Sequence, residues 1–293
     1  NIDKPAGMTS MDVVRRIKRA SRQKRVGHGG TLDPMATGVI AVCMGQATRM
    51  MEYLINGTKG YRAEVELGIV TDTYDALGET TKTRDTSAVT IADIETAIAG
   101  FLGVIDQVPP MYSALKKQGK RLYELARAGI EVEREPRRVE IHSVELVEWT
   151  PPLVTARVGC GRGFYMRSLA HDLGQALECG GHLKSLVRLR SGPFKLEESV
   201  TLQELEELFA DGTWTRRLHS ADVVLGGLRA IIAGRRTQDL IRNGRPISVG
   251  VLDSPNDPNE RCRAYTTDGR FIAIMRFDGP LRQWNPEKVF HPE

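Results

Sequence analysis

The order of strand-like and helix-like segments is the feature that most limits what this chain can fold into. From Tyr61 to Ile69 every second residue is apolar, and a similar alternation returns in residues 139–141 and 154–160, which predicts half-buried strands. Helical periodicity separates these stretches at irregular intervals, and no G-x-G-x-x-G segment follows a strand. The pattern therefore predicts an α+β fold built on a mixed or antiparallel sheet.

Capping residues and apolar periodicity together predict four helices. They are a helix from Ser10 to about Ser21, one from a Thr90–Asp93 capping box to a stop at Gly103, one from Tyr165 to Leu177, and one that begins at Thr201 with Glu204. The first helix would bury Val13, Val14 and Ile17 and leave its arginines and lysines exposed.

A chain of 293 residues suggests two domains, at roughly 100–200 residues per domain. The boundary is predicted near residues 218–227, which divides the chain into domains 1–222 and 223–293. Within the first domain, residues 108–138 are basic, are bounded by prolines and have a weak core pattern, which predicts an insertion on the surface. The second domain is predicted to hold a helix over 228–243 and a hairpin over 263–277 that turns at Asp268-Gly269.

Charge is distributed unevenly, although the net charge is only +4. Seven lysines and arginines, and no acidic residue, lie in the segment 15–25, whereas acidic residues concentrate in 72–79 and 197–211. A second basic group consists of Lys116, Lys117, Lys120 and Arg121. Separated basic surfaces are typical of proteins that bind a phosphate backbone, and ordinary solvated helix faces are the alternative interpretation.

Composition excludes several classes of protein. With 41% hydrophobic and 27% charged residues, the chain is neither wholly disordered nor fibrous. No stretch approaches 18 consecutive apolar residues, and four scattered cysteines do not suggest a disulfide framework. We therefore expect a soluble cytoplasmic protein, monomeric, with buried thiols.

The segment Gly27–Val39 is the most informative one for chemistry. It holds four glycines within twelve residues, so its backbone either bends sharply or is approached closely by other groups. Asp33 lies in its middle, and Pro34 keeps that aspartate out of helical geometry. A stiff loop with one acid suits a nucleophile or a base, while a simple Asx-type turn is the alternative.

Four further segments accompany this loop in a recognisable order. They are Asp3-Lys4-Pro5-Ala6-Gly7-Met8-Thr9-Ser10, Gly60-Tyr61-Arg62, the stretch Pro109–Lys116 with Gly119–Tyr123, and Gly163–Leu169 with Asp172-Leu173-Gly174. With the glycine-rich loop they resemble the motifs of the TruB family of bacterial tRNA pseudouridine synthases, across nearly the whole chain.

The resemblance implies a pseudouridine synthase catalytic domain with a thumb-like RNA-binding insertion, followed by a small β-rich, PUA-like RNA-binding domain. It implies that a specific uridine in the T-loop of tRNA is flipped out and isomerised, so that the bond from N1 to the sugar is replaced by one from C5. This reaction requires no metal, redox partner or energy source, so no cofactor is expected.

The resemblance also assigns roles to the residues that match the motifs. Asp33 would be the essential aspartate, and attack at C1′, addition to the ring and removal of a sugar proton remain open for it. Arg167 would pair with Asp33 and aim its carboxylate. Tyr61 would offer a flat face to the flipped base, and its alternative role is core packing.

Tyr165 would stand near C5 and help to remove its proton. Because residues two apart on a helix point in different directions, we expect Tyr165 just before the helix that carries Arg167. His28 would insert into the T-loop, or would only bond to the backbone. Lys4 would support the active-site loop or contact phosphate. The RNA-binding residues of the insertion would be Lys116, Lys117, Lys120 and Arg121.

Several other functions fit parts of the sequence less well. A zinc site could use Cys160, His171, Cys179 and His182, but only Cys179-x-x-His182 has ligand-like spacing, and no C-x-x-C pair accompanies it. Hydrolysis by Asp33 would usually need a second carboxylate or a metal. An RNA-binding protein without catalysis is the stronger alternative. RNA-guided relatives share the catalytic motifs, but the insertion favours a stand-alone tRNA enzyme.

Overall fold

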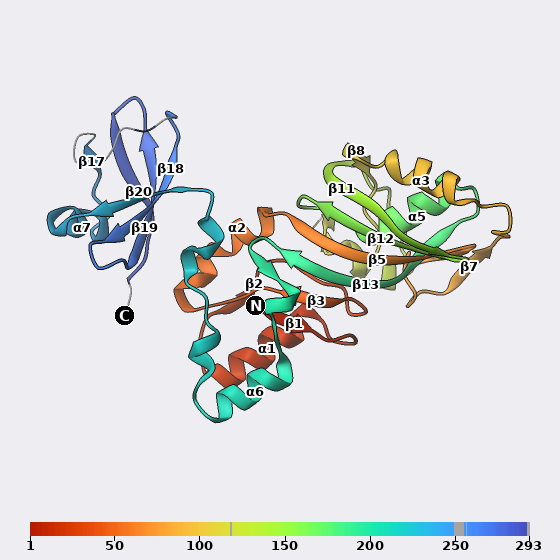
Figure 1. Cartoon of the computed structure of the whole chain (residues 1–293), viewed down its shortest axis with the longest axis horizontal. Helices are drawn as coiled ribbons and strands as arrows, with labels where there is room; N and C mark the ends of the chain where they lie inside the picture. The colour runs from red at the N-terminus through yellow and green to blue at the C-terminus, as the bar shows by residue number, and fades with distance from the viewer. Residues whose placement is uncertain (118, 249–254, 256, 292–293) are drawn as a thin grey trace.

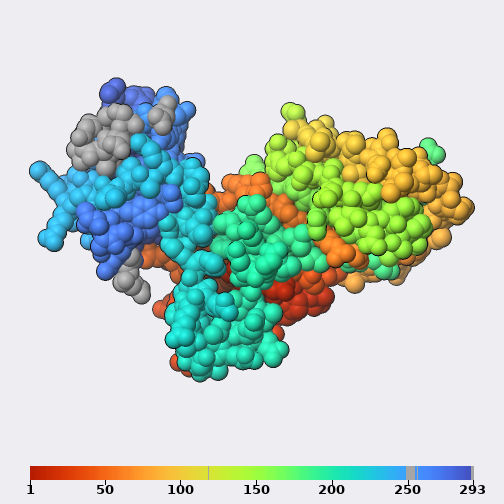
Figure 2. Space-filling view, viewed as in Figure 1, coloured from red at the N-terminus to blue at the C-terminus, as the bar shows by residue number. Residues whose placement is uncertain are grey.

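The computed structural model describes residues 1–117, 119–248, 255 and 257–291. A nine-stranded sheet is the centre of the larger part of the molecule, and a five-stranded sheet forms a smaller lobe near the C-terminus. Figure 1 shows this lobe and the far end of the large sheet at opposite ends of the molecule, and Figure 2 shows a notch between them. The prediction of a β-rich C-terminal part is confirmed.

The large sheet is mixed. Its order is β15 (Val200–Thr201), β1 (Ile2–Lys4), β3 (Thr37–Ile40), β13 (Gly181–Ser191), β5 (Lys59–Leu67), β12 (Leu153–Cys160), β11 (Arg137–Thr150) and β8 (Gly103–Gln107), with β14 (Phe194–Lys195) paired to β13. Strand β1 is parallel to β15, and β13 is parallel to β3. The other pairs in this sheet are antiparallel, which confirms the α+β prediction.

The helices and short elements surround this sheet, except for the last helix along the chain, which packs on the five-stranded sheet of the smaller lobe. The helices are α1 (Ser10–Ser21), α2 (Met51–Asn56), α3 (Ile91–Ala99), α4 (Leu122–Arg127), α5 (Met166–Ala176), α6 (Leu202–Ala210) and α7 (Arg235–Arg242). Three short strand pairs are β2 (Val26–His28) with β4 (Val42–Met44), β6 (Ile69–Thr71) with β7 (Thr80–Thr83), and β9 (Lys116–Lys117) with β10 (Lys120–Arg121). The 3-10 turns are η1 (Gly45–Met50), η2 (Leu196–Glu198), η3 (Trp214–Arg217) and η4 (Ala221–Leu225).

The main core lies between the large sheet and the helices. Along β5, Ala63, Val65 and Leu67 are buried while Arg62 is exposed, as the alternating pattern predicts. Helix α5 packs on β13, and α3 packs on β11 and α5, so these helices cover one part of the sheet (Figure 1). None of the helices within the described residues is long and apolar enough to span a membrane.

Two predicted helix ends need correction. Thr9, rather than Ser10, caps α1. Its hydroxyl accepts the Asp12 backbone N–H, and the Asp12 carboxylate accepts the Thr9 backbone N–H. Ser10 is instead buried in the first turn. Helix α3 ends at Ala99, and Gly103, at a φ of +94°, begins strand β8. A glycine with positive φ thus opens a strand here rather than ending the helix.

The smaller lobe corrects another prediction. Residues 229–233, expected as helix, form strand β16 (Arg229–Ala233), and only α7 is helical. Parallel pairing with β18 (Arg261–Thr266) favours the strand, because it buries Ile231 and Ala233 on one side. The sheet is completed by β17 (Ile247–Ser248), β19 (Phe271–Asp278) and β20 (Gln283–Val289). The hairpin of β18 and β19 confirms the predicted turn at Asp268-Gly269.

An apolar contact joins the two lobes. Met50 and Leu225, from the turns η1 and η4, pack with Ile274 and Phe290 of the smaller lobe. Lys288 also forms an ion pair with Glu52 of α2. Buried apolar groups at this contact hold the smaller lobe against the end of the large domain.

Candidate active site

Asp33 and Arg167 form the centre of the candidate site. Asp33 lies in the turn before β3, and Arg167 in the first turn of α5. The Arg167 Nε lies 2.9 Å from one carboxylate oxygen of Asp33, and Nη2 lies 3.1 Å from the other. This two-pronged pair is the geometry in which arginine binds a carboxylate most strongly. The Arg167 side chain is 6% exposed and that of Asp33 is 31% exposed, so the carboxylate faces an accessible space.

A second carboxylate, which the sequence reasoning missed, lies beside the same arginine. Asp75 is buried, and its Oδ2 is 3.6 Å from Arg167 Nε. The Thr73 hydroxyl and the Leu77 backbone N–H donate to the Asp75 Oδ1, which fixes the carboxylate. Asp75 belongs to the acidic segment 72–79. That concentration of acids was the only sign of Asp75 in the sequence, and the sequence does not show which of them is buried.

Arg167 also contacts the first residues of the predicted insertion 108–138. Its Nη2 donates to the Tyr112 carbonyl at 2.8 Å, and the neighbouring Ser168 hydroxyl donates to the Val108 carbonyl at 2.7 Å. The start of the insertion is therefore bound directly to the residues that hold Asp33.

Tyr165 is the N-cap of α5, with extended backbone, which confirms the prediction that it precedes the helix. The Gln107 side chain fixes its backbone, because Oε1 accepts the Tyr165 N–H at 2.9 Å and Nε2 donates to the Tyr165 carbonyl at 3.1 Å. Burial raises the pKa of the Tyr165 hydroxyl, while nearby Ser113 and Arg167 lower it. Tyr165 is thus a neutral phenol at pH 7.

Tyr61 is half-buried near the start of β5 and packs against the main core. Burial raises its pKa, the Arg188 guanidinium opposes that rise, and the charge of Asp33 adds to it. On the neighbouring strand β13, Arg188 lies opposite Tyr61, and the packing of Tyr61 against the core leaves the structural alternative open.

Arg188, the second residue that sequence reasoning missed, supports the glycine-rich loop. This buried residue of β13 donates to the carbonyls of Val39, Thr31 and Gly30 at 2.6, 3.2 and 3.1 Å. Gly38 has a φ of +98°, and a Cβ there would come within 2.3 Å of the Arg188 carbonyl oxygen. The sequence sign of this residue is a cation among the apolar residues of a predicted buried segment, because a buried cation needs hydrogen-bond partners.

Lys4 lies beneath the loop that carries Asp33. It is fully buried, and its Nζ donates to the carbonyls of Pro5, Met8 and Pro34. Burial lowers the pKa of Lys4 to about 8, although the charge of Asp33 opposes this shift. All three hydrogens of the Lys4 ammonium are used inside the protein, and one bond reaches Pro34 in the loop of Asp33, which favours the loop-supporting alternative over the phosphate contact.

The other predicted site residues lie in two places. His28 is half-buried at the end of β2, its Nδ1 accepts the Gly30 N–H at 3.4 Å, and burial lowers its pKa. The backbone contact foreseen as an alternative is thus present. The basic residues of the insertion lie on the β9–β10 hairpin: Lys116, Lys120 and Arg121 are exposed, while Lys117 is half-buried and donates to the Glu133 carbonyl.

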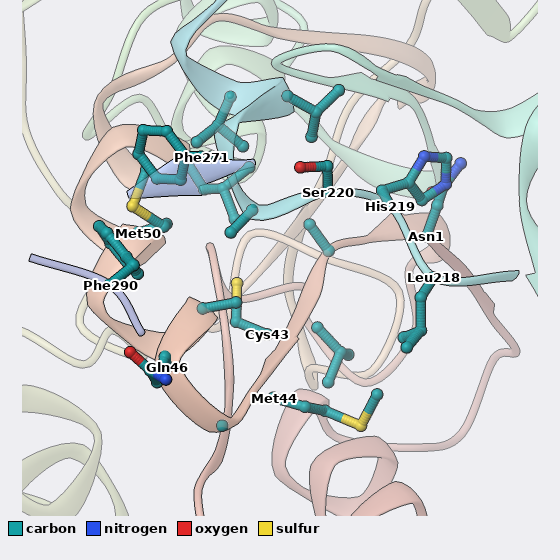
Figure 3. Close-up of a pocket in the computed structure, with 18 of the residues that line it drawn as sticks. Asn1, Cys43, Met44, Gln46, Met50, Leu218, His219, Ser220, Phe271 and Phe290 are labelled. Atoms are coloured by element: carbon teal, nitrogen blue, oxygen red, sulfur yellow. The ribbon is translucent and has the colours of Figure 1, made fainter. Parts of the chain in front are cut away.

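Two other features fail to mark a site. Within the described residues, no three His, Cys, Asp or Glu side chains gather in a way that could hold a metal ion. A cavity of about 900 Å³ lies between the lobes, lined by residues such as Cys43, Met50, Phe271 and Phe290 (Figure 3). None of the candidate site residues lines it. The chemistry around Asp33, rather than cavity size, locates the candidate site.

Comparisons with known proteins agree on one family. A model described as "TruB family pseudouridylate synthase (N terminal domain)" matches residues 18–166, and one described as "tRNA pseudouridylate synthase B C-terminal domain" matches residues 167–232.

Curated relatives and solved structures extend this agreement over the chain. Proteins named tRNA pseudouridine synthase B from Dehalococcoides mccartyi and Clostridium perfringens are 45% and 40% identical, over 99% and 95% of this chain and 95% and 94% of theirs. A Cbf5-Nop10-Gar1 complex contains a chain with a TM-score of 0.75 and 27% identity, covering 100% of this chain and 84% of that one. An H/ACA RNP bound to a substrate RNA containing 2′-deoxyuridine has the same TM-score at 25% identity, with the same coverage. The chain therefore belongs to the TruB family of pseudouridylate synthases.

Proposed function

We propose that this enzyme isomerises a uridine in the T-loop of tRNA to pseudouridine and that Asp33 supplies the reacting carboxylate. The observation that carries the proposal is the pairing of both Asp33 oxygens with a buried arginine, in a loop that Arg188 and Lys4 hold from behind. The names of the curated relatives support uridine isomerisation in tRNA.

The reaction has three parts that the site must serve. The bond from N1 to C1′ breaks, the uracil turns, and C5 bonds to C1′ and then loses its proton. A half-exposed carboxylate held by a guanidinium suits attack at C1′, addition to the ring or removal of a sugar proton, and these three routes remain alternatives. Each route ends with the Asp33 carboxylate regenerated.

The neighbouring side chains would receive the base. Tyr61 would offer a face to the flipped uracil, and His28 would enter the space that the base leaves. Tyr165 would stand near C5. Because its hydroxyl is neutral at pH 7, its oxygen would accept the C5 proton as it releases its own proton to water, rather than act as a phenolate.

The remaining parts of the chain would serve tRNA binding. Residues 1–222 would form the catalytic domain, residues 108–138 its thumb-like insertion, and residues 223–293 a PUA-like RNA-binding domain. We also propose that the enzyme acts in the cytoplasm, as a monomer and without a cofactor.

One assay tests the proposed function. The purified chain is incubated with tRNA that carries tritium at uridine C5, with and without a chelator. Release of tritium into water is expected, because the new bond to C5 displaces that hydrogen. Tight tRNA binding without tritium release would support the RNA-binding protein without catalysis instead. A need for an added guide RNA would place the chain with the RNA-guided relatives.

We expect Arg167→Lys to lower the single-turnover rate by about 10- to 100-fold. Lysine cannot reproduce the two parallel bonds to Asp33, and each lost charge-assisted hydrogen bond costs about 1.5–3 kcal/mol, where 1.4 kcal/mol is tenfold. Rapid-quench kinetics at saturating enzyme measure the rate, and thermal unfolding checks that the variant is folded. A folded variant with the wild-type rate would contradict the role of the ion pair.

Replacing Lys116, Lys117, Lys120 and Arg121 with alanine should weaken tRNA binding and flatten its salt dependence. Each lost phosphate contact is expected to reduce the log–log slope by about 0.7–0.9. Filter binding over a range of salt concentrations measures the slope. Lys195→Ala, which removes an exposed lysine of β14, is the control. An unchanged slope in the fourfold variant would show that the insertion does not contact RNA phosphates.

A further inference from the structure

Helix α1 carries a row of positive charge that the catalytic chemistry does not use. Arg15, Lys18 and Arg19 lie along one side of the helix, Arg22 follows as its C-cap in left-handed conformation, and all four residues are exposed. We call these four residues the α1 basic stripe. At a rise of about 1.5 Å per residue, the helical part of the stripe, from Arg15 to Arg19, spans roughly 6 Å.

Helix stability does not account for the stripe. Residues three and four apart on a helix are neighbours, and like charges at that spacing destabilise it. Asp12 pairs with Arg15 at 3.2 Å, but no carboxylate among the described residues pairs with Lys18, Arg19 or Arg22. Cations in the last turn favour the helix dipole, but that effect does not require four of them in one row.

A different side of α1 is neutralised by the protein itself. Arg16 points to α6, where Glu206 pairs with it, and the two helices lie side by side (Figure 1). The acidic helix α6 thus neutralises one side of α1, while the stripe remains open to solvent.

The segment that carries the stripe is connected at both ends to the glycine-rich loop that holds Asp33. At the start of α1, the Ser10 hydroxyl donates to the Leu32 carbonyl and accepts the Leu32 N–H, one residue before Asp33. After the stripe, the chain returns through β2 to His28. The stripe is therefore held at a set position relative to the reacting carboxylate.

We propose that the α1 basic stripe binds the phosphate backbone of the substrate tRNA beside the loop that carries Asp33. The inference rests on the proposed function, because it takes tRNA as the polyanion that reaches Asp33. Exposed cations beside a site for RNA chemistry are the arrangement that phosphate contacts require, and three of the four have no carboxylate partner among the described residues. Two further exposed cations, Lys24 and Arg25, extend the basic surface toward β2.

The test replaces Arg15, Lys18, Arg19 and Arg22 with glutamine in the full chain. Glutamine has nearly the same helix propensity as arginine and lysine, so α1 should stay folded, which circular dichroism checks. If all four residues contact phosphates, the slope of log affinity against log salt should fall by about 3, at about 0.7–0.9 per contact. At about 0.1 M salt, tRNA affinity should fall at least tenfold.

Two measurements separate this inference from its alternatives. The single-turnover rate at saturating enzyme should stay within about twofold of the wild type, because the stripe does not touch the reacting atoms. The matched control is Arg16→Gln on the same helix, which should leave the salt slope unchanged because Arg16 faces α6, on a different side of α1 from the stripe, and pairs there with Glu206.

A folded fourfold variant with the wild-type salt slope would overturn the inference, even if the wild-type enzyme forms pseudouridine. Binding of the wild type to vesicles that contain anionic lipid, lost in the fourfold variant while its tRNA slope is unchanged, would assign the stripe to a membrane surface and also overturn it. If the wild type forms no pseudouridine, the proposed function fails separately.

Discussion

Asp33→Asn should abolish pseudouridine formation while leaving tRNA binding within a few-fold of the wild type. An amide of the same size can neither attack a sugar carbon nor accept a proton, so the rate should fall by at least about 10⁴-fold, the scale seen when a reacting nucleophile is removed. Arg167 would keep Asp75 as a neighbouring carboxylate at 3.6 Å, so the buried guanidinium is not left without a negative charge and the variant should fold.

The measurement is tritium release in a single turnover, together with filter binding of tRNA by the same preparation. Asp33→Glu is the companion variant: it keeps the charge but moves the carboxylate by one methylene, so a large loss there too would show that position matters as well as charge. Appreciable turnover by Asp33→Asn would defeat the assignment of Asp33 as the reacting group.

Tyr165→Phe should lower the single-turnover rate by roughly 10²–10⁴-fold, the usual contribution of a group that transfers a proton in the transition state. The ring would stay in place, because Gln107 holds the backbone of residue 165 on both sides and does not depend on the hydroxyl. Binding of tRNA should therefore change little, and binding and chemistry would separate.

The competing expectation is that the Tyr165 hydroxyl is only structural. The variant would then lose about 1 kcal/mol of unfolding free energy, the value of one hydrogen bond, and would keep its rate. Tyr265→Phe is the control, because it deletes a hydroxyl that bonds to Asp222 in the smaller lobe, away from the site. If both variants lose stability and neither loses rate, Tyr165 has no part in proton transfer.

Local patterns in the sequence were sufficient for much of the fold. The alternation in residues 61–69 requires only that one side of a strand be buried, and β5 has that burial. The capping box of Thr90 and Asp93 is complete within four residues, and the structure contains it. The same logic failed at residues 229–233, where pairing with β18, more than thirty residues later, selects a strand.

In the candidate site, too, some residues could be identified from the sequence and others only from the tertiary structure. The sequence by itself identified Asp33 through its glycine-rich loop, and the motif around Arg167 through family resemblance. Only the tertiary structure brought Asp75 to Arg167, showed Arg188 behind the loop and buried the ammonium of Lys4. The physical reason is that a loop's composition is local, whereas the partner of a buried charge is set by packing between segments far apart in the chain. Arg167 and Asp33 are 134 positions apart, and no spacing rule covers such a contact.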